Sequence, residues 1–188
     1  AMKYTFSLIG VLAMAAIGCG GPKDVKGVLQ DATQAMGNPT TLEYSGAGMN
    51  GFVGQALTAG QAWPRRDLAS FTRRVNYDQK SASEELNFAQ AVFGGQQQNS
   101  YVNGDKAWSM GANGAVPARA AAEERQLQVW LTPHGFLKAA SAAADAAMAP
   151  AAEGQPHVVS FTALGKYRIN GTISPEGLLE RVETRIAN

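Results

Sequence analysis

Residues 158–186, VVSFTALGKYRINGTISPEGLLERVETRI, decide the fold because they alternate three segments of strand length with two short turns. The strand-like segments are 158–164, 167–173 and 178–186. The turns are Gly165-Lys166 and Pro175-Glu176-Gly177, and glycine and proline favour tight turns at such positions. Strands joined by connections this short run antiparallel. The sequence therefore predicts an antiparallel sheet in the last third of the chain.

A second group of strand-like segments lies upstream. Segment 71–77 places Phe71, Val75 and Tyr77 on one face, and segment 83–90 places Leu86 and Phe88 on a common face after turn residues. This alternation predicts a hairpin. The neighbouring sequence predicts a strand over 41–48, a bulge or bend over 46–54, a polar loop over 94–99 and a short hairpin over 101–110.

Helical periodicity is present in two regions. Apolar residues recur at three- and four-residue spacing over 22–37, which ends in Gly37, and again over 117–131. Thr132 as N-cap and Pro133 at the first helical position then predict a second helix that continues into the alanine-rich stretch up to residue 152.

The order of these elements predicts an α+β fold. We expect a curved antiparallel sheet, with an N-terminal helix and a central helix pair packed on one face, in a single domain over 22–188. This order is similar to that of periplasmic lipoprotein carriers and chaperones, in which a half-barrel sheet wraps helices around an apolar cavity. The last strand runs to Asn188 without a terminating signal, so we expect the domain to be truncated there.

Composition excludes several classes of function. Among 188 residues, 45% are hydrophobic and 16% are charged, which fits a globular domain, and the net charge of +1 argues against nucleic-acid binding through bulk charge. One cysteine and two histidines exclude a disulfide framework and a thiolate- or histidine-rich metal site. The motifs of zinc hydrolases, serine hydrolases, P-loop and dinucleotide-binding proteins are absent from the sequence. We expect no catalytic residue, no metal site and no cofactor in this chain.

Residues 1–21 have the pattern of an export signal. A basic start precedes an uncharged run over 4–17 and a small-residue exit, and glycine and proline interrupt the run before it reaches the length of a membrane span. Ala16-Ile17-Gly18-Cys19 resembles a lipobox, although the family pattern prefers leucine where Ala16 stands. We expect Cys19 to carry a lipid anchor on the periplasmic side of a bacterial membrane, with the outer membrane favoured because Gly20 follows. The alternative is an ordinary signal peptide.

Two polar side chains are candidates for a binding site. His134 stands at the start of the second central helix, where a helix N-terminus favours anions; the alternative is a capping or loop histidine. Arg73 shares a strand face with Phe71 and Val75, so a covered face would require a partner or an anionic ligand for its guanidinium. The alternative is that Arg73 extends to the sheet edge.

Several segments resemble the N-terminal region of exported bacterial metallo-β-lactamase-fold hydrolases, which precede their zinc domain with an extra module. The most specific segment is 122–139, AEERQLQVWLTPHGFLKA. The others are Trp63-Pro64-Arg65, 70–73 with Tyr77-Asp78, 83–86, 158–162, 165–167, Asn170-Gly171 and 179–184. The resemblance covers 25–188 and implies that the zinc ligands lie in a downstream domain, so no catalytic residue can be transferred to this chain.

Two hypotheses about function follow. The first is an exported, lipid-anchored, non-catalytic module that accompanies a zinc hydrolase domain absent from this chain. The second is a periplasmic or outer-membrane lipoprotein that binds a hydrophobic or lipid-like ligand. Its binding face would be lined by the following residues: Phe71, Arg73, Val75, Leu86, Phe88, Trp108 and His134.

Overall fold

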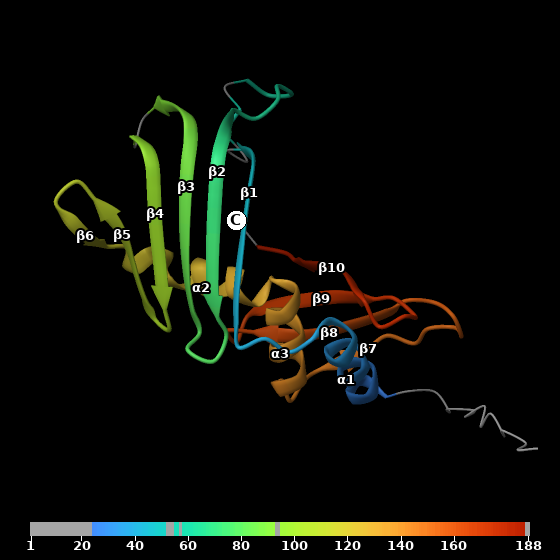
Figure 1. Cartoon of the computed structure of the whole chain (residues 1–188). Coiled ribbons are helices and arrows are strands. Elements are labelled where there is room, and N and C mark those ends of the chain that lie inside the picture. The colour runs from blue at the N-terminus through green and yellow to red at the C-terminus, as the bar shows by residue number, and fades with distance from the viewer. Residues whose placement is uncertain (1–23, 52–54, 57, 93–94, 187–188) are drawn as a thin grey trace, which may run out of the picture.

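The computed structural model describes residues 24–51, 55–56, 58–92 and 95–186, which form three α-helices and two antiparallel sheets (Figure 1). Sheet A contains β1 to β6 in sequence order, and sheet B has the order β10-β9-β8-β7. The helices are α1 (Val25–Met36), α2 (Ala122–Trp130) and α3 (Pro133–Ala142), with a 3-10 turn at Arg119–Ala121. The strands are β1 (Thr41–Gly51), β2 (Arg65–Asn76), β3 (Ser81–Val92), β4 (Gly95–Asn103), β5 (Lys106–Gly111), β6 (Gly114–Pro117), β7 (Ala147–Met148), β8 (His157–Ala163), β9 (Tyr167–Ile173) and β10 (Leu179–Thr184).

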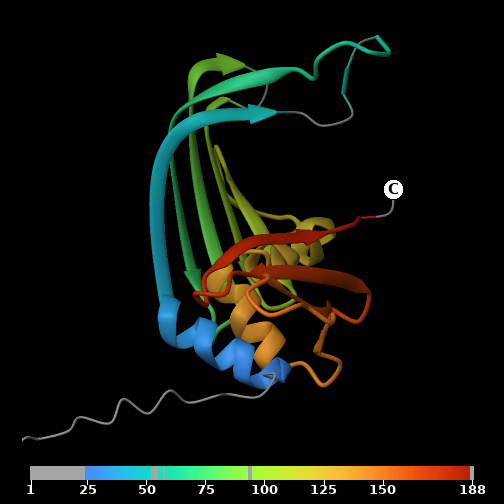
Figure 2. The same ribbon diagram turned by 90° about the vertical axis from the view of Figure 1, so that its right-hand side faces the viewer.

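The predicted α+β class and the packing of the helices on antiparallel sheet are confirmed. The strands form two sheets where the sequence predicted one, because the α2–α3 pair separates β6 from β7 along the chain. Figure 2 shows sheet A on one side of the molecule, curving over at the end that carries the β1–β2 connection. The helices and sheet B lie on the other side.

Three predicted boundaries were wrong. The polar loop expected over 94–99 is part of β4, whose glutamines and asparagines pair with β3 from Asn87↔Gln97 onward. The helix expected to start at residue 117 begins at Ala122, after β6 and the 3-10 turn. The alanine-rich stretch leaves the helix at Ala142, because pairing of β7 with β8 outweighs its helix propensity. The predicted bulge near Gly46 is confirmed as a register shift between Gly46 and Gly48.

Side-chain caps fix the start of two helices. The Asp24 carboxylate accepts a hydrogen bond of 2.8 Å from the Gly27 backbone N–H and so caps α1. The Thr132 hydroxyl accepts a hydrogen bond of 3.2 Å from the Gly135 N–H, as the sequence predicted for α3. Both caps satisfy backbone donors that have no partner inside the helix.

Helix α2 lies between two hydrophobic cores. The larger core joins α1, α2 and α3 to sheet B, and its buried members are Val28, Leu29, Ala32, Leu127, Phe136, Leu137, Ala140, Val159, Phe161, Ala163, Ile169 and Ile173. The smaller core joins α2 to sheet A, and its buried members are Val75, Tyr77, Val102, Ala107, Ala122 and Val129. Leu127 and Val129 therefore turn from the same helix toward different sheets.

Polar contacts also hold α2 against both sheets. Arg125 donates to the backbone carbonyls of Tyr101 at 3.1 Å and Trp108 at 2.6 Å, which joins the helix to β4 and β5. On the other side, the Glu123 carboxylate accepts hydrogen bonds from Lys166 at 2.7 Å and from the Tyr167 hydroxyl at 2.5 Å. These hydrogen bonds hold the pKa of Glu123 below its usual value, and the one from Lys166 has the largest effect.

Candidate functional site

The face of sheet A that packs on α2, called the inner face here, carries most of the residues predicted to bind a ligand. Phe71 pairs with Leu86, and Val75 pairs with Ala82 in the α2 core, so these side chains share one face. Arg73 lies between them, and Phe88 follows Leu86 by two residues on β3. The predicted grouping of Phe71, Arg73, Val75, Leu86 and Phe88 on one sheet face is therefore confirmed.

Trp108 does not belong to this group, and its predicted place on the inner face was wrong. It pairs with Tyr101, while the adjacent Ala107 pairs with Val102 in the inner core. The two aromatic rings stack at 5.3 Å between centroids on the outer face of sheet A. The physical reason is the alternation of side chains along β5: Ala107 is buried with Ala122 in the core under α2, so the next residue, Trp108, points to the opposite face.

The Arg73 guanidinium has protein partners, as expected for an arginine on a covered sheet face. The guanidinium lies 3.5 Å from the Glu84 carboxylate on β3 and 3.4 Å from the Gln128 side-chain oxygen on α2. The side chain is 14% exposed, so it does not extend to the sheet edge. Its Nε atom is buried and has no hydrogen-bond partner among the described residues.

His134 and Arg73 line the same pocket, as do Leu42 and Tyr44 of β1. This pocket has a volume of about 490 Å³ and lies between sheet A and the α2–α3 turn. The Nε2 atom of His134 is 3.2 Å from the carbonyl oxygen of Met36 at the end of α1. The structure thus brings two predicted site residues together, although His134 also serves to join α3 to α1.

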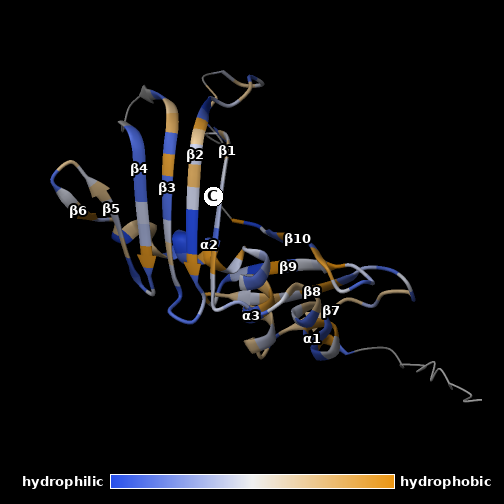
Figure 3. Ribbon diagram, in the orientation of Figure 1, coloured by the Kyte–Doolittle hydropathy of each residue, from blue (hydrophilic) through white to orange (hydrophobic). Residues whose placement is uncertain are grey.

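Beyond Arg73 the inner face becomes apolar again. We call Tyr44, Leu68, Phe71, Leu86 and Phe88 the inner patch; its strand positions follow from the pairings Leu68↔Phe88, Phe71↔Leu86 and Tyr44↔Arg73. Tyr44 and Phe71 meet edge to face at 6.1 Å. Figure 3 shows apolar colouring on β2 and β3 away from α2, while β4 is hydrophilic along most of its length.

The inner patch is only partly covered by the described residues. Phe88 is fully buried, with the Arg66 guanidinium 3.5 Å from its ring centroid, an attractive cation–π geometry. Tyr44, Leu68, Phe71 and Leu86 remain half-buried. Opposite Phe71, Gly46 supplies no side chain, and a Cβ there would lie 3.0 Å from the Phe71 ring. The patch therefore runs along β1, β2 and β3 between Arg73 and Arg66.

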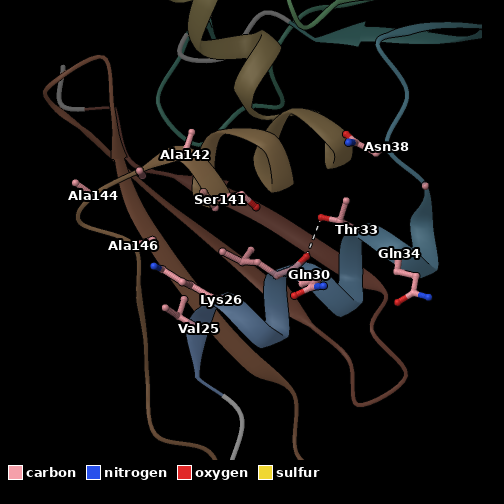
Figure 4. A pocket seen from close by; sticks show the side chains of 14 residues that line it. Val25, Lys26, Gln30, Thr33, Gln34, Asn38, Ser141, Ala142, Ala144 and Ala146 are labelled. Atoms are coloured by element: carbon pink, nitrogen blue, oxygen red, sulfur yellow. Dashed lines mark hydrogen bonds between the residues drawn. The ribbon is translucent and has the colours of Figure 1, made fainter.

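A larger hollow lies elsewhere, between α1 and the C-terminal half of α3 (Figure 4). It has a volume of about 1060 Å³, and Val25, Leu29 and alanines of the 140–146 stretch form its apolar part. Lys26, Gln30 and Gln34 stand along its α1 side. None of the predicted ligand-binding residues lines it. The sequence feature that could have indicated this hollow is the alanine-rich stretch, because small side chains leave space where the helix ends.

The described residues offer neither a metal centre nor a membrane span. No group of three or more His, Cys, Asp and Glu side chains among them could hold a metal ion. Within the same part of the chain, no helix has the length and apolar character required to cross a bilayer. Cys19 and the expected export signal over 1–21 lie outside the described residues.

Comparison of the chain with protein-family models, with curated proteins and with solved structures finds no match in any of the three.

Proposed function

We propose that this chain is an exported, lipid-anchored, non-catalytic module that accompanies a metallo-β-lactamase-fold hydrolase domain. The observation that carries the proposal is the inner patch, an apolar surface that continues along sheet A beyond the part that α2 covers. The resemblance of residues 25–188 to the module that precedes such zinc domains supports the same conclusion. Cys19 would supply the membrane anchor.

A half-covered apolar face is a natural contact surface for a second domain. Burial of apolar surface contributes roughly 25 cal/mol per Å², and large contiguous apolar patches on soluble proteins usually mark contact sites. Val75 and Val102 of the same face are already buried under α2. The neighbouring domain would extend this cover over Phe71 and Leu86.

Strand β10 supports the same location for the partner domain. It is one of the two edge strands of sheet B, and both views place it nearer than β9 and β8 to the curved end of sheet A. Leu178 and Ile186, which flank it, are 50% and 56% exposed. An edge strand has unpaired backbone groups that can accept another strand.

If the proposal is correct, the protein purified from its own cells should carry a hydrolase domain and bound zinc.

The second candidate is a binding protein for an amphipathic, lipid-like ligand, and the position of Arg73 favours it. An apolar surface with a cationic side chain at its base fits an acyl chain with an anionic head group. Arg73 already contacts Glu84 and Gln128, so an incoming anion would compete with these side chains. The same inner patch would then be covered by the ligand.

A fluorescent dansyl-labelled fatty acid tests this second candidate. Phe71→Asp and Leu86→Asp should each weaken binding by about tenfold or more, because a charge replaces a half-buried apolar contact. These positions are better choices than Val75 and Phe88, which are 2% and 0% exposed and whose substitution by aspartate would unfold the sheet. Val116→Asp is the matched control, since Val116 is 54% exposed outside the patch. If the probe fails to bind the folded wild-type chain, this candidate is wrong.

A further inference from the structure

The outer face of sheet A carries a row of five side chains that cross the sheet from β1 to β5. Glu43 pairs with Arg74, Arg74 with Ser83, Ser83 with Tyr101, and Tyr101 with Trp108. Directly paired residues share a face and stand about 5 Å apart. Since Arg73, Glu84 and Val102 occupy the inner face, this row is separate from the inner patch and from the surface assigned above to the hydrolase domain.

The row contains an aromatic wall with a gap beside it. The rings of Tyr101 and Trp108 are parallel within 4°, with centroids 5.3 Å apart. Trp108 thus covers one face of the Tyr101 ring, and the other face is directed toward β3, where the paired residue is only Ser83. A hollow of about 550 Å³ lies here, and Arg74, Ser83, Tyr101 and Trp108 are among the residues that line it. Pockets of this size accommodate small ligands.

The Arg74 guanidinium at the hollow is shared between two carboxylates. The Arg74 Nε atom lies 2.6 Å from the Glu43 carboxylate, and a second guanidinium nitrogen lies 2.6 Å from the Glu85 carboxylate. These hydrogen bonds, of which the one with Glu85 has the largest effect, raise the pKa of Arg74 above its ordinary value, so the guanidinium stays protonated. The charged side chains that line the hollow, Glu43 and Arg74, are thus already paired with each other.

The remaining polar side chains around the hollow are neutral donors and acceptors. Thr41, Asn76, Ser81 and Asn103 line the side toward the ends of the strands. A hydroxyl or amide can both donate and accept a hydrogen bond, which suits a ligand that carries several hydroxyl groups. The hollow thus combines an aromatic ring face, a floor formed by a small residue, neutral hydrogen-bonding groups and an arginine that is already paired with carboxylates.

We propose that this hollow binds a neutral saccharide, with one sugar ring against the free face of Tyr101 above Ser83. A pyranose ring has an apolar C–H face that packs on an aromatic ring and a rim of hydroxyl groups that requires donors and acceptors. Arg74 is held at 2.6 Å by each of two carboxylates, whereas Arg73 has one carboxylate at 3.5 Å, so an anionic ligand at Arg74 would have to displace a closer partner. The site lies on the sheet face opposite the proposed domain contact, so both could be occupied together.

Titration of the isotope-labelled chain with chitotetraose and with maltotetraose, followed by NMR, tests the proposal. We expect at least one of these neutral sugars to shift the backbone signals of Ser83 and Tyr101 and the indole N–H signal of Trp108. Signals of Phe71 and Leu86 on the inner face should not move. The absence of any shift at about 10 mM of both sugars would exclude even weak binding and overturn the proposal.

Two variants and one control make the assignment specific to the hollow. Tyr101→Ala should lower the affinity by about tenfold or more, because it removes the stacking surface. Ser83→Phe should also abolish binding by filling the gap, and an aromatic residue is well tolerated in a strand. Trp63→Ala removes a 50% exposed tryptophan outside this face and should bind like the wild type. Wild-type affinity in a folded Ser83→Phe variant would contradict the proposal.

Discussion

Gly171→Ala should destabilise the protein by about 3 kcal/mol, although alanine ordinarily suits a strand better than glycine. A Cβ atom at residue 171 on β9 would lie 2.3, 2.4 and 2.8 Å from three atoms of the Phe136 ring. That ring is 0% exposed and packs against Phe161 at 5.5 Å between centroids, so it cannot move away without opening the core between α3 and sheet B. Urea unfolding of the variant measures the loss.

The same contact can be tested by compensation. Gly48→Ala is the matched control, because a Cβ there meets nothing within 4 Å, and we expect a change within about 0.5 kcal/mol. By itself, Phe136→Leu should lower the free energy of unfolding. In the Gly171→Ala background the same substitution should lower it less, because the smaller side chain makes room for the new methyl group. If Gly171→Ala were as stable as the wild type, the packing of α3 on β9 described above would be wrong.

Gly135→Ala should have an effect of similar or greater size, about 3 to 5 kcal/mol. The added Cβ would lie 2.1 Å from the Val129 carbonyl oxygen and 2.6 Å from the Thr132 hydroxyl. Neither atom can shift easily, because the hydroxyl donates to that carbonyl at 2.7 Å and also lies 3.1 Å from the Tyr77 hydroxyl. The α2–α3 turn and its contact with sheet A would both be disturbed.

Circular dichroism during heating measures this second effect. We expect the melting temperature of Gly135→Ala to fall well below that of the wild type, while Gly48→Ala again serves as the control. Thr132→Val, which removes the hydroxyl but keeps the shape, should cause a smaller loss through its missing hydrogen bonds. An unchanged melting temperature in Gly135→Ala would contradict the close approach of residue 135 to Val129 and Thr132.

Local patterns in the sequence predicted much of this fold. The alternation around Val75 placed the inner face of β2 correctly, and Thr132-Pro133 marked the start of α3. Such features depend on neighbouring residues, which a sequence shows directly. The faces of Leu86 and Phe88 were predictable for the same reason, since side chains alternate along any strand.

Long-range packing accounts for what could not be predicted. The face taken by Trp108 depends on the approach of α2 to Ala107, and the extension of β4 depends on backbone pairing with β3. The local pattern of those residues shows neither the position of the helix nor the identity of the partner strand. The hollow beside Tyr101 also requires the register, because it arises where Ser83 of one strand faces an aromatic residue of the next.

Intact mass and zinc content of the native protein test the proposed function most directly. The protein would be isolated from the membrane fraction of its own cells with an antibody to this chain, without denaturant. We expect a polypeptide or stable complex well above 19.7 kDa that contains bound zinc and a hydrolase domain. A native chain that runs only from Cys19 to Asn188, carries acyl groups and has no zinc-containing partner would contradict the proposal.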